Sequence, residues 1–361
     1  MISDIHCTFR FDNVNELMAK SSSRNNSKVC FKTICFHLII SFYYCKLKKR
    51  FTKPPDRMNA LIEFLTILPE EINNKRLKLG QNRRDQLKCL FKQSSIYILQ
   101  FLEASLQSFL ENSPLDSGQL SNKLRLIYKC FSSWIEEKLI EPQLIANSPL
   151  FAYLFQIFFQ AECELELHEV VTTCLVNILL MYPFNARCTD ENKTLLLSLK
   201  ENIINLAVAY KQCESQQQME KCMDFCLIFT ELCNALSYYL INEPTSTLGD
   251  MNTINLLIMC GAHAEYEVFQ KSFIFWFNIS EEIYTNPKSE HLCVQFRNFI
   301  YQLIECICRH CRLRATHQTV PPAKTDDFGD FRAKASDLVA DIVFIVEGNK
   351  CFEKVCVIFH D

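Results

Sequence analysis

Cysteine and histidine residues at two places could bind a metal. Cys308 and Cys311 form a C-x-x-C pair, which supplies two of the four ligands that a structural zinc site needs. The chain has no second pair at a matching distance. The segment His263-Ala264-Glu265 resembles the H-x-E part of the zinc deaminase signature, but Ile307 stands where that signature has proline before C-x-x-C. We therefore expect both cysteines to pack on the apolar side of a helix, and we expect no metal or cofactor.

Other catalytic patterns are incomplete. His168-Glu169 lacks the second histidine of the zinc-binding H-E-x-x-H motif. No Ser or Cys stands in the strand-turn-helix pattern that acyl transfer uses. The chain has 6 glycines in 361 residues, and no two are spaced for a phosphate-binding loop. The sequence therefore predicts a protein that is not an enzyme.

The scarcity of glycine also indicates the fold class. Tight hairpin turns and nucleotide-binding turns between strand and helix both draw on glycine, so an all-helical chain is favoured. Apolar residues in 222–240 and 296–311 recur at i, i+3, i+4 and i+7, the period of an amphipathic helix. Helices are expected at 58–68, 83–110, 119–138, 143–160, 164–182, 192–212, 216–242, 249–262, 264–286, 289–312 and 329–348.

The rhythm of these helices predicts a solenoid of the HEAT type. Short connections separate the helices, which pair at about 40–50 residues per pair. We expect an all-α HEAT-repeat superhelix of about five helix pairs over residues 58–355. One or two globular helical bundles are the alternative.

Charge divides the chain into two parts. Residues 1–57 carry 11 Lys and Arg against 4 Asp and Glu, whereas residues 58–361 carry 27 against 37. An acidic body does not fit a nucleic-acid binder and suits a basic protein partner better. Residues 1–57 are expected to be an atypical, poorly ordered extension, with a localisation patch at 46–50 or a membrane anchor as alternatives. Their apolar run at 34–45 is shorter than the roughly 20 residues of a membrane span, so no membrane is expected.

The 20 cysteines fit a reducing compartment better than a secreted disulfide scaffold. Most of them fall at apolar positions of the helical pattern, as Cys174, Cys226, Cys233 and Cys260 do. There they are expected to act as small buried hydrophobic residues.

Several short segments match the motifs of a known family. They are 61–71 (LIEFLTILPEE), 76–84 (RLKLGQNRR), 228–233 (IFTELC), 266–268 (YEV), 275–277 (FWF) and, as the strongest match, 325–332 (TDDFGDFR) followed by 336–339 (SDLV). These segments resemble the transportin-SR-like import receptors of the importin-β superfamily and their relative importin thirteen, and 61–71 resembles the LLEILTVLPEE segment of that superfamily. The resemblance covers about residues 59–355 and leaves 1–57 and the tail 356–361 unmatched.

This resemblance implies a nuclear import receptor that shuttles between cytoplasm and nucleus. Such receptors carry serine/arginine-rich splicing factors, pass the pore by contacts with Phe-Gly nucleoporins, and release cargo to GTP-bound Ran. Family members are more than twice as long, and their main Ran-binding and cargo-reading repeats have no counterpart in the 361 residues. A truncated helical-repeat scaffold without transport activity is therefore the alternative.

Two groups of charged residues are candidates for partner contacts. The acidic group enters the last expected helix, where helix capping is the alternative role. The basic group precedes and begins the second expected helix, where a solvated helix face is the alternative. The candidates are Asp326, Asp327, Asp330 and Arg332 in the first group and Arg76, Arg83 and Arg84 in the second.

Overall fold

A computed structural model describes residues 54–73, 80–111, 117–160, 162–182, 184–185, 188–312, 327–346, 348–349 and 352. Every regular element in these residues is a helix, which confirms the expected all-α class. The chain divides into two compact units, one up to Ile98 and one from Leu99 onward. Residues 1–53, which hold nearly all of the expected extension, and the tail 356–361 lie outside the described part.

The first unit contains helix α4 (Pro54–Asn73) and the beginning of α5 (Gln81–Glu111). Helix α4 starts four residues before the expected helix at 58, so the expected domain boundary at 57 falls inside it. Leu61, Ile62 and Leu65 are buried along one side of α4, as its helical spacing requires.

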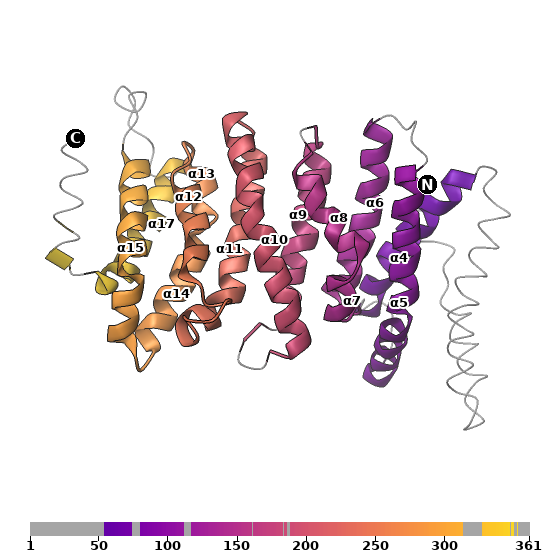
Figure 1. The fold of residues 1–361 in the computed structure, drawn as a ribbon, viewed down its shortest axis with the longest axis horizontal. Coiled ribbons are helices and arrows are strands. Elements are labelled where there is room, and N and C mark those ends of the chain that lie inside the picture. Colours follow the sequence, from indigo (N-terminus) through magenta and orange to yellow (C-terminus); the bar gives the residue numbers. More distant parts are fainter. Residues whose placement is uncertain are drawn as a thin grey trace. The chain divides into compact units, whose positions relative to one another are not determined.

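The second unit consists of helices in two layers. Its first layer contains α6 (Ser117–Glu136), α9 (Leu165–Met181), α11 (Met219–Asn242), α14 (Phe273–Thr285) and α17 (Asp327–Ile342), each packed against the next. Its second layer contains α7 (Pro142–Ala146), α8 (Pro149–Phe158), α10 (Asp190–Ser215), α12 (Asn255–Gly261), α13 (Tyr266–Gln270) and α15 (Ser289–Cys311). Short 3-10 helices η1 (Met251–Ile254) and η2 (Val343–Ile345) precede α12 and follow α17. Figure 1 shows the helices from α6 to α15 following one another in chain order.

Polar contacts between equivalent helices show the length of the repeat. Ser148 Oγ donates to Glu103 at a separation of 45 residues, and Asn177 donates to Ser132 at the same separation. Ser237 and Glu282 are again 45 residues apart. Stacking one helix pair on the next therefore places corresponding residues side by side, which is the defining property of a helical-repeat solenoid.

Two expected helices are each broken into two. The expected helix 143–160 is α7 followed by α8, because Pro149 begins a new helix and the Ser148 side chain caps it by accepting from the Leu150 amide at 3.2 Å. The expected helix 264–286 is α13 followed by α14. The break falls at Ser272, whose hydroxyl donates to the Phe269 carbonyl at 2.8 Å and is fully buried.

The core of the second unit runs between the two layers. Trp134, Phe225, Phe229 and Trp276 are fully buried there. Helix α11 is long and apolar enough to cross a membrane by length and composition, but 61% of its most apolar window is buried against neighbouring helices. Its apolar character is therefore explained by its central place in the helix stack.

Candidate protein-binding surface

The predicted acidic group lies at the start of α17. Asp327 and Asp330 are exposed in its first turn, where the helix dipole favours negative charge. Between them Phe328 is buried, and Phe331, also buried, lies 4.7 Å from the Tyr266 ring centre. The phenylalanines of this motif therefore anchor α17 to α13, and its aspartates point to solvent.

The remaining residues of that group and the basic group divide between structure and surface. Arg332 is exposed, with its guanidinium 6.0 Å from the Phe328 ring centre, and Arg83 is exposed on α5. Arg84 is half-buried and donates to the Ile72 carbonyl at 2.7 Å, so it closes the last turn of α4. Asp326 and Arg76 lie outside the described residues.

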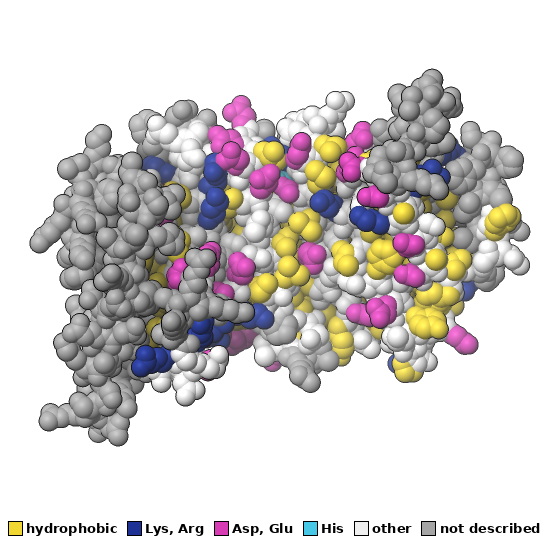
Figure 2. Space-filling view, turned by 180° about the vertical axis from the view of Figure 1, so that it is seen from behind, with side chains coloured by type: hydrophobic (Ala, Val, Ile, Leu, Met, Phe, Trp, Pro, Cys, Tyr) yellow, Lys and Arg dark blue, Asp and Glu magenta, His cyan; other side chains and the backbone are white. Residues whose placement is uncertain are grey.

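A second acidic feature, which the sequence interpretation did not single out, lies on three neighbouring helices. Helices α9, α11 and α14 together carry seven Asp and Glu but only one basic residue, Lys221. Lys221 is buried, and its ammonium donates to the Cys163 carbonyl at 2.7 Å. Acidic side chains lie among exposed hydrophobic ones on the face drawn in Figure 2. These three helices therefore present negative charge that no basic side chain of their own offsets.

We call the carboxylates of Glu169, Glu231, Glu281 and Glu282 the acidic surface. None of the four forms an ion pair with another described residue. Burial raises the pKa of Glu231 and of Glu282, and a side-chain hydrogen bond from Asn234 or Ser237 partly opposes this. Each of these two carboxylates is therefore partly desolvated and lacks a cation.

A shallow hollow lies between α11 and α14 at one end of this surface. It has a volume of about 390 Å³ and is lined by Asn234, Ser237, Asn278, Glu281, Glu282 and Thr285. All six side chains are polar, and Asn278 donates to Asn234 across the helices at 3.4 Å. The hollow thus offers carboxylate and amide oxygens, which accept hydrogen bonds from guanidinium and ammonium groups.

Two further carboxylates of these helices are already paired. Glu166 forms an ion pair with Arg125 of α6. Asp224 lies 2.7 Å from Nδ1 of His168, a side chain that is 2% exposed. These two pairs join neighbouring helices. The acidic surface and the exposed Glu220 at the start of α11 are the part available to a partner.

The cross-helix contacts also fix the register of the acidic surface. The His168–Asp224 pair, 56 residues apart, puts Glu169 level with residue 225 of α11. The Ser237–Glu282 contact puts Glu282 level with residue 237, so Glu231 is six residues from each level. Six residues span about 9 Å of helix, and neighbouring helix axes lie about 8–10 Å apart. For ideal neighbouring helices, the backbone positions that carry successive carboxylates are therefore about 13 Å apart along a diagonal.

The cysteines show no sign of a catalytic or metal-binding role in the described residues. None of the described cysteines forms a disulfide, Cys308 is buried and Cys311 is half-buried. Burial raises the pKa of Cys163 and of Cys306 to about 11, which keeps these thiols protonated near neutral pH. Within the described part of the chain, no group of three or more candidate ligands could hold a metal ion.

The fold and this surface define the class: a helical-repeat solenoid that presents an acidic face. A family model described as the second TPR domain of transportin-3 and importin-13 matches residues 217–310, and one for exportin 1-like proteins matches 15–179. The second match begins inside the segment 1–57, for which the sequence alone gave no resemblance. Both matches agree with the expected resemblance to nuclear transport receptors of the importin-β superfamily.

Individual relatives agree with this resemblance. Importin-13 of Gallus gallus and of Pongo abelii are each 23% identical to this chain over 298 residues, and importin-13 of Homo sapiens is 22% identical. Each alignment covers 81% of this chain and 29% of the relative. The chain therefore spans less than a third of the length of these curated relatives.

Proposed function

We propose that this chain is a segment of a nuclear import receptor that contributes to cargo binding, in which the acidic surface binds an extended, arginine-rich segment of the cargo. The observation that carries the proposal is the charge of α9, α11 and α14, seven acidic residues against one buried lysine. Serine/arginine-rich proteins are the cargo that fits this charge and the transportin-SR-like resemblance. Carrying cargo of this kind needs no bond chemistry, so we infer that the chain is not an enzyme.

Unpaired, partly desolvated carboxylates favour a cationic partner. Burial makes the charged form of Glu231 and of Glu282 less stable than in water, which raises the pKa of each carboxyl. A guanidinium placed beside them restores the lost interaction with water by charge-assisted hydrogen bonds. The free energy of that exchange supports binding of a basic segment over a neutral one.

The spacing of the surface supports an extended chain. Steps of about 13 Å correspond to about four residues of extended backbone, at about 3.3 Å per residue. In an arginine/serine dipeptide repeat, all arginines of an extended chain lie on one side, because side chains alternate between the two faces. Every second arginine would then meet Glu169, Glu231 or the Glu281–Glu282 pair.

GTP-bound Ran and Phe-Gly nucleoporins are further proposed partners. We infer that GTP-bound Ran displaces the cargo, that Phe-Gly nucleoporins bind elsewhere on the solenoid, and that the protein shuttles between cytoplasm and nucleus. The exposed Asp327, Asp330, Arg332 and Arg83 are the proposed additional contacts to these protein partners. A helical-repeat scaffold that binds neither Ran nor cargo is the second candidate.

A binding experiment separates the two candidates. Fluorescence anisotropy would measure the affinity of the full chain for a labelled eight-repeat Arg-Ser peptide at low and at physiological salt, and a pull-down would compare GTP-loaded with GDP-loaded Ran. We expect the triple variant E231Q/E281Q/E282Q to bind the peptide about tenfold more weakly, or about 1.4 kcal/mol. We also expect wild-type binding to weaken as salt screens the charges.

The matched control removes the same number of charges from the second layer. Glu191, Glu201 and Glu290 are exposed on α10 and α15, so E191Q/E201Q/E290Q changes net charge equally. Its affinity should stay within about twofold of wild type, because these residues lie off the acidic surface. Equal losses in both variants would overturn the assigned surface, and a wild type that binds neither peptide nor GTP-loaded Ran would favour the scaffold.

A further inference from the structure

The connection from α11 to the next helix pair folds back on the end of α11. The Glu243 amide donates to the Tyr239 carbonyl at 2.8 Å, and the Gly249 amide donates to Ser246 Oγ at 3.1 Å. A Cβ atom at Gly249 would lie 2.0 Å from the Glu243 carbonyl oxygen. Only glycine permits this close approach, so residues 243–250 have one compact path.

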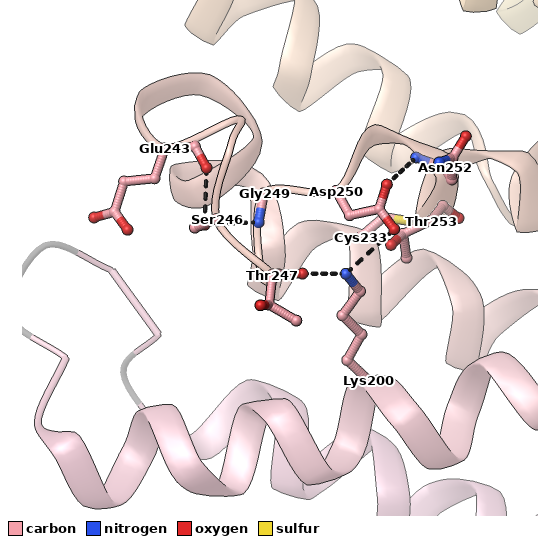
Figure 3. A network of polar contacts seen from close by, with 9 residues as sticks. All are labelled: Lys200, Cys233, Glu243, Ser246, Thr247, Gly249, Asp250, Asn252 and Thr253. Carbon is pink, nitrogen blue, oxygen red and sulfur yellow. Dashed lines mark hydrogen bonds and ion pairs between the residues drawn. The ribbon is translucent and has the colours of Figure 1, made fainter.

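A lysine from another helix holds this connection from below, as Figure 3 shows. Lys200 of α10 is buried, and its ammonium donates to the Thr247 carbonyl and lies 3.7 Å from an Asp250 carboxylate oxygen. The other oxygen of Asp250 accepts from the Asn252 amide at 3.0 Å and so caps η1. One ammonium group thereby connects α10 to both the connection and the start of the next helix pair.

The cost of burying this charge indicates a role beyond stability. An ammonium group removed from water is stabilised only partly by a carboxylate at 3.7 Å that is itself 44% exposed. An apolar side chain of similar volume commonly gives equal or greater stability at such positions. Polar buried groups are retained where they fix the register of neighbouring elements.

The connection lies between helices that carry the acidic surface. Residues 243–250 lead from α11, which carries Glu231, through η1, α12 and α13 to α14, which carries Glu281 and Glu282. The path of the connection therefore sets where the next helix pair begins. We propose that Lys200 is a positioning residue for the acidic surface: it clamps this connection so that the carboxylates of α11 and α14 keep the spacing that an extended basic segment requires. This inference rests on the proposed function of that surface.

Two methionine variants test the proposal by the sign of their effect. Lys193 lies on the same helix and is half-buried, so K193M and K200M each remove one positive charge from α10. If only charge mattered, both variants would bind the Arg-Ser peptide more tightly than wild type. We expect K193M to bind equally or slightly more tightly and K200M to bind about three- to tenfold more weakly. K200R should restore affinity, because a guanidinium can also donate to the Thr247 carbonyl.

Hydrogen exchange tests the clamp without any peptide. The amides of Ser246, Gly249 and Asn252 all donate within the connection or to Asp250. In the full chain, K200M should increase their exchange rates about tenfold or more, and D250N, which keeps the capping oxygen, should give a smaller increase. Unchanged exchange in both variants would overturn the clamp, as would equal peptide affinity of K200M and K193M. If the wild type binds no peptide but K200M still increases these exchange rates, the proposed function is overturned and the clamp stands.

Discussion

The two layers of the second unit share one core but differ in charge. Helices α9, α11 and α14 of the first layer carry seven acidic residues and one buried lysine, whereas α10 and α15 of the second layer carry six acidic and five basic residues. Both layers bury comparable apolar side chains against each other. The difference therefore does not arise from packing, and under the proposed function the exposed side of the first layer is the side that binds a basic partner.

Within the first layer, buried residues that stabilise the solenoid also differ from exposed residues that do not. In the first layer, buried side chains such as Trp276 hold the stack together, and side chains such as Glu281 are exposed to solvent. Substitutions at the two kinds of position should have clearly different consequences. Three predictions follow this difference from the largest expected effect to the smallest.

The largest effect should come from the core of the first layer. Trp276 is fully buried at the centre of α14, so W276A leaves a cavity that its neighbours can fill only partly. We expect a loss of about 3–5 kcal/mol in the free energy of unfolding. Urea denaturation followed by circular dichroism measures it. E281Q in the same helix should change the free energy of unfolding by less than about 0.5 kcal/mol. A similar loss in W276A and E281Q would contradict the distinction between core and surface positions.

The next effect should distinguish buried from exposed links between neighbouring first-layer helices. His168 is 2% exposed where it contacts Asp224, whereas Arg125 and Glu166 are 26% and 67% exposed. We expect H168A to lower the free energy of unfolding by about 2–4 kcal/mol, because it also removes ring contacts with Phe158 and Phe225. R125A should lower it by less than about 1 kcal/mol. Urea denaturation of both variants tests this order, and an inverted order would contradict it.

The smallest effect should appear in the pH dependence of stability. The pKa values of Glu231 and Glu282 are raised in the folded state, so the folded state binds protons first as pH falls. The destabilisation by their charges is present above the raised pKa values and disappears below the ordinary range of a glutamate. E231Q/E282Q should therefore melt at a slightly higher temperature than wild type at pH 7, and at nearly the same temperature at pH 4. A variant that melts lower at pH 7 would show that these carboxylates stabilise the fold.

Much of the architecture could be predicted from the sequence because the signals of a helix lie in residues that are close together in the chain. The apolar spacing in 222–240 predicted α11 to within three residues at its start, and the same spacing predicted α15. The breaks inside 143–160 and 264–286 were missed, since apolar residues continue through both. In the first, Asn147-Ser148-Pro149 is a recognisable stop and start signal. In the second, the buried Ser272 gives no comparable local signal.

The candidate surface was less accessible to sequence interpretation. The Asp327–Arg332 motif was found by resemblance, and the structure shows that its phenylalanines anchor α17 while its charged residues are exposed. The acidic surface left one signal, the lack of basic residues over 165–181, 219–242 and 273–285 apart from Lys221. That signal becomes meaningful only when these three segments are known to be neighbours.

The sequence by itself determined the helices, the repeat and the family resemblance. It did so because helical periodicity, capping residues and short motifs depend on residues close together in the chain. The tertiary structure alone decided which helices share a layer, which carboxylates stand unpaired on one diagonal, and that Lys200 reaches the connection at Thr247 and Asp250. Those relations join residues about 45 positions apart or more, as between Ser237 and Glu282, and only the packing of one repeat on the next brings such residues together.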